Sequence, residues 1–421
     1  MLEQVSVVNG VKICSMVNPN LNSFCLSLYI RAGSLFENSS NNGISHLFEH
    51  IVFRNIKNKY EKFYEYLAVH GIDFHGCTYK EFIRFSLNGP RHEFLVATEV
   101  LCSIFDCINL SKTEFENEKR RIKAEIRENN ERYSLDFLFN QLVWKDSEAQ
   151  KTVLGYCKVL DGISVKRLND FRRECFSQDN CIIYITGAVD KKDIDDLIEK
   201  INAIDIQKKK SLRTNTISVN ENFFHRDGTI TVKNGYWNYI KIGFDIDSSN
   251  YTNGILDLLY AILFKGDKGL MHSYLSEKNP LIYSYDSTLE QYNNVANINF
   301  KFEVEKTKIE DAIKRIVVLL KDLTAGDFNF NASLKAEMYY TEMELDRPDD
   351  LNWSMAYYNH ILDTQPIDYS DEYYGRFEIT KQQIIEAAKD IFQAKNMTIA
   401  IEGNKKKINV QSIENIIKTL E

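Results

Sequence analysis

The chain has 421 residues, of which 44% are hydrophobic and 27% are charged, and its formal net charge is −8. This length and composition are typical of a globular protein with two or three domains. A nucleic-acid partner would need a basic face, and a membrane span would need an apolar run of roughly 18 residues. The sequence shows neither feature, so we expect no nucleic-acid partner and no membrane partner.

The first residues, MLEQVSVVNGVKICSMV, lack the basic start and the apolar block of a signal peptide. We therefore expect a cytoplasmic protein. Its eight cysteines contain no CxxC pair, which favours buried, reduced thiols.

Strand-like alternation and helical periodicity follow one another along the chain. The expected strands lie at 25–33, 82–89, 181–186, 229–234, 296–304 and 397–402. The expected helices lie at 92–108, 115–129, 191–201, 382–392 and 410–420. Strands in hairpin-like order with helices between them predict an α+β fold class with mostly antiparallel sheets.

Two segments in the two halves of the chain follow one pattern. Asn180 precedes the strand CIIYIT and Gly187 ends it, whereas Asn396 precedes MTIAIE and Gly403 ends it; an amphipathic helix follows each strand. The two asparagines are 216 positions apart, about half the chain, as an internal duplication of two similar domains would produce. Chance similarity of two strand–helix units is the alternative.

Residues 203–222 carry a lysine run and small polar residues without clear periodicity, which is typical of a connection between domains. The predicted organisation is an N-terminal domain at 1–205, a linker at 206–222 and a C-terminal domain at 223–421.

The stretch GISHLFEHIVF contains two histidines four positions apart with a glutamate between them. On a helix, His46 and His50 lie about 40° apart on one face, and Glu49 lies beside them. Two imidazoles on one face can bind one zinc ion while the carboxylate reaches the water on the metal. A surface helix with two incidental histidines is the alternative, although the apolar flanks indicate a half-buried helix.

A catalytic zinc needs a third protein ligand. Glu118 and Glu125 are seven positions apart on the helix 115–129, so they share a face with Ile122. A buried carboxylate there would need a partner, and a metal would be one. A solvated, charged helix explains the same residues equally well, because four basic residues lie beside the two acids.

These residues together resemble the inverted zinc motif of the insulinase/pitrilysin family of metallopeptidases, the inverzincins. The match consists of HxxEH at 46–50, 74 intervening residues, and an E-x6-E pair that ends at Glu125. Further similarities are GSLFE at 33–37, GISH at 43–46, Leu154-Gly155 and Asp179-Asn180. The resemblance covers nearly the whole chain and is strongest to the half-length, two-domain members.

The resemblance implies a zinc site and a function. His46, His50 and Glu125 would be the zinc ligands, Glu49 the general base, and Glu118 a carboxylate that orients a ligand. The N-terminal domain would carry this site, and the C-terminal domain would be an inactive homologue that closes over a peptide chamber like the second half of a clamshell.

Family members bind peptide as an added strand on a sheet edge. The matching substrate-binding residues are His75, Gly76, Cys77 and Thr78, with His75-Gly76 where the family usually has Asn-Ala. His75 is expected to line the groove or to have a structural role, and a fourth metal ligand is the alternative role for it.

The C-terminal domain contains GLMHSYLSEKNPLIY at 269–283, which resembles the family's substrate clamp. Tyr283 matches the clamp tyrosine, but Ser276 stands where the family has an arginine, and Pro280 replaces a glycine. This departure favours a homodimer, or a heterodimer with a related chain that supplies the arginine.

The sequence thus predicts a zinc endopeptidase that processes a precursor or leader peptide in bacteria, for example that of a ribosomally made natural product. A non-catalytic scaffold subunit of the same family, or a subunit that escorts peptides without cutting them, is the alternative.

Overall fold

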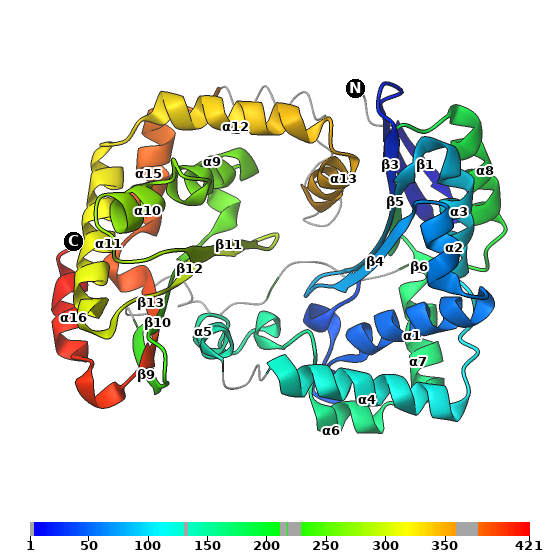
Figure 1. The fold of residues 1–421 in the computed structure, drawn as a ribbon, viewed down its shortest axis with the longest axis horizontal. Helices are drawn as coiled ribbons and strands as arrows, with labels where there is room; N and C mark the ends of the chain where they lie inside the picture. The colour runs from blue at the N-terminus through cyan, green and yellow to red at the C-terminus, as the bar shows by residue number, and fades with distance from the viewer. Residues whose placement is uncertain (1–3, 130–133, 211–216, 218–228, 359–377) are drawn as a thin grey trace. The chain divides into compact units, whose positions relative to one another are not determined.

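The computed structural model describes residues 4–129, 134–210, 217, 229–358 and 378–421 (Figure 1). Its contacts divide the chain into two compact units, and each unit combines segments that are far apart in sequence. The first unit comprises 1–129, 151–215 and 342–370, and the second comprises 130–150, 216–341 and 371–421. None of the described helices is both long enough and apolar enough to cross a bilayer.

The first unit is built on a six-stranded sheet with the order β1-β2-β7-β3-β5-β4. Neighbouring strands are antiparallel except β2 and β7, which are parallel. The strands are β1 (Gln4–Val8), β2 (Val11–Val17), β3 (Ser23–Ile30), β4 (Asp73–Thr78), β5 (Ile83–Pro90) and β7 (Cys181–Gly187). Strand β4 is therefore an edge of this sheet.

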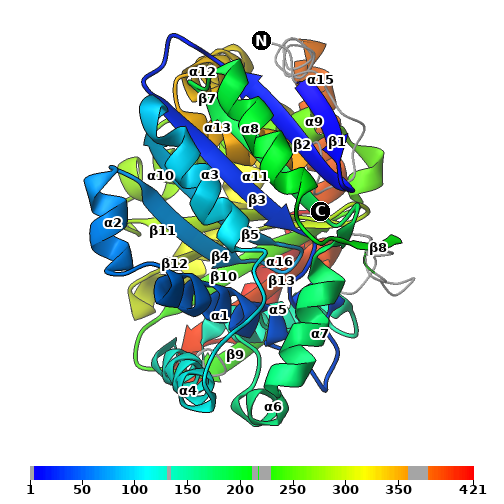
Figure 2. The ribbon, with the colours of Figure 1, turned by 90° about the vertical axis from the view of Figure 1, so that its right-hand side faces the viewer.

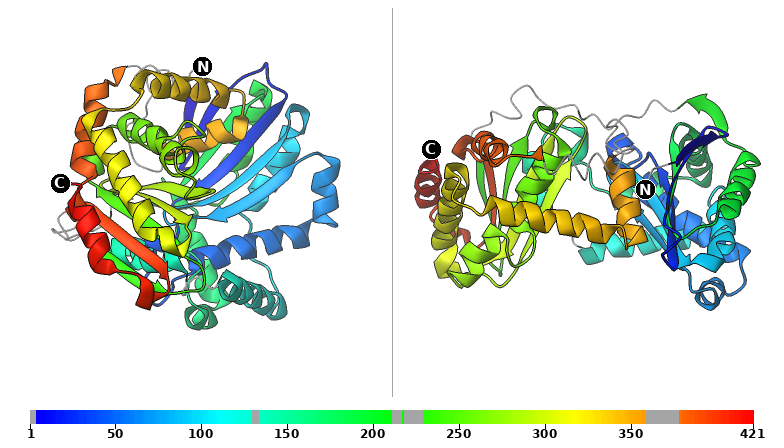
Figure 3. Two further views of the ribbon diagram at one scale, coloured as in Figure 1. Left: turned by 60° about the vertical axis from the view of Figure 1, so that its left-hand side comes forward. Right: turned by 90° about the horizontal axis from the view of Figure 1, so that it is seen from above.

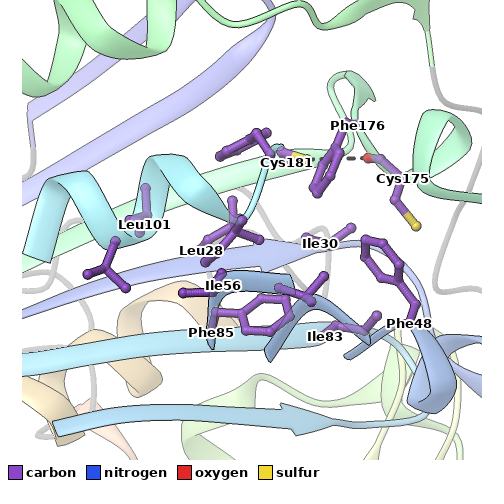
Figure 4. Close-up of a cluster of buried hydrophobic side chains, with 14 of the residues drawn as sticks. Leu28, Ile30, Phe48, Ile56, Ile83, Phe85, Leu101, Cys175, Phe176 and Cys181 are labelled. Atoms are coloured by element: carbon purple, nitrogen blue, oxygen red, sulfur yellow. Dashed lines mark hydrogen bonds between the residues drawn. The ribbon is translucent and has the colours of Figure 1, made fainter. Parts of the chain in front are cut away.

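Helices cover one face of the first sheet, as Figure 2 shows for α3 and α8. The core beneath them contains Leu28, Ile30, Phe48 and Phe85, all fully buried (Figure 4). The helices are α1 (Ile44–Lys59), α2 (Phe63–Val69), α3 (Phe94–Ser103), α4 (Lys112–Asn129), α6 (Cys157–Gly162), α7 (Val165–Cys175) and α8 (Lys191–Asn202).

The second unit is built on a five-stranded sheet with the order β11-β12-β10-β13-β9. Only β13 and β9 run parallel. The strands are β9 (Thr229–Asn234), β10 (Tyr239–Ile246), β11 (Tyr285–Gln291), β12 (Ala296–Glu303) and β13 (Met397–Gly403). The helices are α5 (Leu135–Val143), α9 (Asn253–Phe264), α10 (Leu270–His272), α11 (Ile309–Ala325), α12 (Phe330–Glu344), α15 (Lys381–Ile391) and α16 (Val410–Lys418), with α16 packed beside α11 (Figure 3).

The two sheets have the same strand order. Reading from the edge, β4-β5-β3-β7-β2 corresponds to β11-β12-β10-β13-β9, and the parallel pair falls at the same place in both. The strands that carry the repeated sequence pattern, β7 and β13, occupy equivalent positions. The prediction of two similar α+β domains with mostly antiparallel sheets is confirmed.

The asparagines that open the repeated pattern also play equivalent parts. Asn180 donates from Nδ2 to the carbonyl of Cys175, and Asn396 donates from Nδ2 to the carbonyl of Ile391, both over 2.8 Å. Each bond ties the strand to the end of the helix that precedes it, and both side chains are buried.

Two helices belong to one unit although the segments before and after them in the sequence belong to the other. Helix α5 joins the second unit, where Asp136 accepts hydrogen bonds from Lys241 and Lys301. Helix α13 (Pro348–Ala356) joins the first unit, where Asn352 bonds to Tyr29. Most of the expected linker at 206–222 lies outside the described residues, but Gln207–Lys210 forms β8, which pairs with β6 (Ser177–Gln178).

We predict that Asn180→Ala and Asn396→Ala each lower the free energy of unfolding by about 1–3 kcal/mol, because each removes the buried hydrogen bonding of the asparagine amide. Urea unfolding followed by circular dichroism measures the change. The exposed Asn202→Ala should stay within about 0.5 kcal/mol of the parent. Equal effects at all three positions would contradict the role given to the two buried bonds.

Candidate metal centre

The N-terminal half of helix α1, which carries His46, Glu49 and His50, is packed into the core. Ile44, Leu47, Phe48 and Ile51 are fully buried and fix the helix against the sheet. His46 and Glu49 are also buried, with 6% and 8% of their surfaces exposed. The alternative of a surface helix is therefore wrong, and the role of the two histidines stays a prediction.

The start of α1 is held by a buried carboxylate, that of Glu37. Its Oε2 accepts hydrogen bonds from the Gly43 N–H over 2.7 Å and from Asn42 Nδ2 over 2.9 Å, and its Oε1 accepts from the Ser45 N–H over 2.9 Å. A negative charge at a helix N-terminus satisfies otherwise unpaired N–H groups and interacts favourably with the helix dipole. Glu37 thereby fixes the turn that presents His46.

Two glycines allow this start of the helix to pack closely. Gly43 has φ of 96°, and Gly155 has φ of 71°. A Cβ on Gly155 would lie 2.4 Å from the Asn42 carbonyl oxygen and 2.5 Å from the Gly43 Cα. Gly155 thus packs directly against the residues that start α1, which gives a physical reason for the glycine in the family-like pair Leu154-Gly155.

Helix α4 presents the two acids. Ile122, fully buried, lies between Glu118 and Glu125 on the face that contacts α1. Glu118 is 7% exposed, whereas the side chain of Glu125 is 38% exposed. The helix 115–129 is thus not simply a solvated charged helix.

The structure brings His46, His50 and Glu125 together, each with a ligand atom within 4.8 Å of the others. Glu125 Oε2 lies 3.7 Å from His46 Nε2 and 3.6 Å from His50 Nε2. Among the described residues, no other group of three or more His, Cys, Asp or Glu side chains comes close enough together to hold a metal ion, and His75 is not part of this group. Two imidazole nitrogens and one carboxylate are the donors that a catalytic zinc uses.

The two histidines are held differently. Glu118 Oε2 lies 3.8 Å from His50 Nδ1, on the side of the ring away from Glu125, and this histidine is the main cause of the lowered pKa of Glu118. Burial, with a contribution from His50, lowers the pKa of His46 to about 3, so its ring is neutral. A neutral imidazole has the lone pair that a metal requires.

Glu49 lies beside this group without being part of it. Thr78 on β4 donates from Oγ1 to Glu49 Oε2 over 2.8 Å. Burial raises the pKa of Glu49, and the Thr78 hydrogen bond opposes that increase. The carboxylate is therefore tied to the edge strand through one oxygen.

Alternate residues of β4 face opposite ways. Thr78 and Gly76 lie on the side of α1, and a Cβ on Gly76 would come within 2.3 Å of the Phe53 ring and 3.2 Å of Glu49 Oε1. His75 and Cys77 alternate with them and are exposed. The Phe53 ring thus accounts for glycine where the family usually has alanine, an explanation that the sequence did not reveal.

The clamp segment lies in the second unit. Tyr283 is 96% exposed and precedes β11, whereas Ser276 lies in a π-helix formed by Ser273–Glu277. Lys278 contacts the ring of Tyr274, with its Nζ 4.3 Å from the ring centroid. Tyr283 and the metal-ligand group therefore belong to different units.

Comparison with known proteins defines the class of protein. Residues 12–154 match the family model described as insulinase (peptidase family M16), and residues 162–332 match the one described as the peptidase M16 inactive domain. The chain belongs to peptidase family M16, as a half-length, two-domain member.

Particular relatives are distant. The chain is 20% identical over 333 residues to the zinc protease PqqE of Helicobacter pylori, which covers 77% of this chain and 75% of that protein. It is 27% identical over 187 residues to the mitochondrial-processing peptidase subunit beta of Saccharomyces cerevisiae, a match that spans 43% of this chain and only 40% of that subunit. A crystal structure of a protease from Helicobacter pylori has the same fold, with a TM-score of 0.84 at 18% identity over 96% of this chain and 99% of that one.

We predict that Glu37→Gln lowers the free energy of unfolding by about 1.5–3 kcal/mol, because the amide replaces one charged acceptor with a donor that faces other donors. Urea unfolding measures the loss. Glu61→Gln makes the same chemical change at an exposed position and should have an effect below about 0.5 kcal/mol. If both variants behave alike, Glu37 does not hold the helix start.

Proposed function

We propose that this chain is a zinc-dependent endopeptidase. The observation that carries the proposal is the meeting of His46, His50 and Glu125 beside Glu49, which is itself tied to an edge strand. A metal site, a base and a peptide-binding edge then lie together in one unit. Membership of family M16 and the printed name of the relative PqqE, a zinc protease, support the same function.

His46, His50 and Glu125 would hold the zinc, and Glu118 would orient His50 through its Nδ1–H. When bound, zinc lowers the pKa of a coordinated water and polarises the carbonyl of the scissile bond. The burial of His46 keeps its ring neutral for this purpose and excludes bulk water from one side of the site.

Glu49 would act as the general base and then as the general acid. Its Oε2 is occupied by Thr78, so Oε1 takes the proton from the attacking water and passes it to the leaving amine. The raised pKa of Glu49 favours such a role, since a base that must later release its proton needs a pKa closer to neutrality than that of an exposed carboxylate.

The free edge of β4 would bind the peptide as an added strand. Among the described residues, β4 pairs only with β5, so one side of its backbone is open to a new strand. Main-chain hydrogen bonds depend little on the sequence of the bound peptide, and its side chains would alternate between the two faces of the sheet. His75 and Cys77 would border the peptide, with Gly76 and Thr78 on the metal side.

The proposed biological role is processing of a precursor or leader peptide in bacteria. The yeast relative is named as a processing peptidase, and the Helicobacter pylori relative is a bacterial zinc protease. All eight cysteines are free thiols, which supports the proposed cytoplasmic location. A scaffold or escort subunit is disfavoured, because such a subunit has no need of Glu49 held next to the ligands.

The first test compares one chemical change at two positions. Glu49→Gln should retain about one zinc per chain and lose at least about 100-fold in the rate of peptide hydrolysis, because Glu49 is the base and not a ligand. Glu125→Gln should lose the zinc itself. Elemental analysis and a mass-spectrometric assay on an unstructured peptide give the two readouts.

Three results from these measurements would contradict parts of the proposal. Full zinc occupancy in Glu125→Gln would remove Glu125 from the ligand set. Parental activity in Glu49→Gln would rule out the proposed base, and a parent with normal zinc but no activity on any peptide would favour the scaffold function.

We also propose that the active form is a dimer in which a second copy or a related chain supplies the missing cation. Ser276 cannot replace the charge or the reach of an arginine, and Lys278 is engaged with Tyr274. A hydrogen bond to a charged group contributes roughly 1.5–3 kcal/mol, so its loss should weaken transition-state binding by about 10- to 100-fold.

The dimer is tested with the purified chain, alone and mixed with the products of neighbouring genes. We expect the chain alone to be slow and a partner, or Ser276→Arg, to raise kcat/KM by about 10- to 100-fold. Ser276→Ala is the matched control and should change nothing. Full activity of the chain alone, with no gain from a partner or from the arginine, would contradict the dimer.

A further inference from the structure

A cavity of about 390 Å³ opens beside His50, entirely within the first unit. It adjoins both the proposed base and the proposed peptide edge, so a side chain of a peptide bound along β4 would enter it. Its lining residues are Glu49, His50, Phe53, Arg54, Lys57, Tyr64, Phe74, His75, Gly76, Glu118 and Arg121. The composition of this lining therefore bears on which peptides the site accepts.

One stripe of α1 runs from the metal ligands into the cavity. His46, His50, Phe53 and Lys57 follow one another at intervals of three and four residues, which places them on one face of the helix. Phe53 packs against Phe74 from β4, with 4.5 Å between the ring centroids and an angle of 33° between the ring planes. The inner wall of the cavity is therefore aromatic.

The rim of the cavity is cationic. Lys57 lies over the ring of Tyr64, with its Nζ 5.0 Å from the centroid, and the side chain of Arg121 on α4 is 75% exposed. Arg54, the third cation, donates to Glu114 over 3.2 Å, so its charge is compensated. Within the described part of the chain, Lys57 forms no ion pair.

The acids that line the cavity are already engaged. Glu49 accepts a hydrogen bond from Thr78. Glu118 Oε2 lies 3.8 Å from His50 Nδ1 and also 3.8 Å from Arg121 Nη1. Lys57 therefore has no acidic side chain to pair with, and Arg121 shares one that serves a histidine. A ligand with its own carboxylate would supply the missing partner.

We propose that this cavity selects a peptide group that ends in a carboxylate: a glutamate side chain close to the scissile bond, or the free C-terminus of a short peptide. The hydrocarbon stem of the group packs on Phe53 and Phe74, and its carboxylate lies between Lys57 and Arg121. This inference names the substrate class of the proposed peptidase and so rests on that proposed function.

The hydrolysis test uses a proteome-derived peptide library, with cleavage sites read by mass spectrometry, in free and C-terminally amidated forms. We expect glutamate to be enriched close to the cut and a Glu→Gln peptide to lose about three- to tenfold in kcat/KM. The loss should shrink in 0.5 M salt, because exposed charges are then screened. Cuts at a fixed distance from the C-terminus that vanish on amidation would assign the carboxylate to the chain end.

Variants assign the effect to the cavity. The double variant Lys57→Gln with Arg121→Gln should cleave the Glu and Gln peptides equally. The double variant Lys57→Glu with Arg121→Glu should prefer a peptide with lysine at that position over the Glu and Gln peptides. Arg120→Gln removes the same charge from the neighbouring residue of α4, which does not line the cavity, and should keep the preference. Equal cleavage of the Glu and Gln peptides by the parent, or an equal loss in Arg120→Gln, would overturn the inference.

A binding measurement separates this inference from the proposed function. Fluorescence anisotropy of labelled Glu and Gln peptides on the zinc-loaded Glu49→Gln chain needs no hydrolysis. Tighter binding of the Glu peptide by about three- to tenfold, without cleavage by the parent, would keep the inference and reject the peptidase. Cleavage by the parent, with equal binding of both peptides, would support the peptidase function and reject the inference about the cavity.

Discussion

The chemistry proposed for this chain depends on the burial of one helix. Helix α1 is fixed to the sheet by fully buried aliphatic and aromatic side chains, so His46 and Glu49 are removed from water together with them. Burying polar groups is unfavourable unless each has a partner. Glu37 pairs with the start of the helix, Thr78 with Glu49, and Glu118 with His50. The Nε2 atoms of the two histidines face Glu125, where a metal ion would be a further partner, and the buried Nδ1 of His46 has no hydrogen-bond partner among the described residues.

The same burial links the metal centre to the peptide edge. Phe53 lies one turn beyond His50 on α1 and occupies the space that a side chain at position 76 would need. Strand β4 can approach α1 closely only because Gly76 has no Cβ, and that approach brings Thr78 to Glu49. The glycine, the aromatic ring and the hydrogen bond are thus three parts of one packing constraint.

Much of this arrangement could be predicted from the sequence, because it depends on local patterns. The i, i+4 histidines and the repeated strands β7 and β13 are carried by periodicity. The spacing of Glu118 and Glu125 places the two acids on one face of a helix, but their assignment to the metal site rests on the resemblance to the family motif. What the sequence did not show depends on contacts between distant segments. The transfer of α5 and α13 to the opposite units, the Phe53–Gly76 approach and the cations around the cavity have no local signature, since Lys57 and Arg121 look like ordinary surface residues until α1 and α4 are placed side by side.

The duplication gives a reason why one half can lack the proposed metal site and still carry a proposed peptide contact. Helix α9 follows β10 in the second unit as α1 follows β3 in the first, but its sequence, NGILDLLYAILF, offers no histidine and no glutamate. The sheet itself is kept, with β11 as its edge where the first unit has β4. Tyr283, the proposed clamp residue, lies two positions before the start of that strand. The proposed peptide contacts are thus associated with the equivalent edge strands of the two copies, within β4 in the first unit and just before β11 in the second. This is what would follow if the ancestral unit bound peptide at its sheet edge and only one copy retained the proposed metal site.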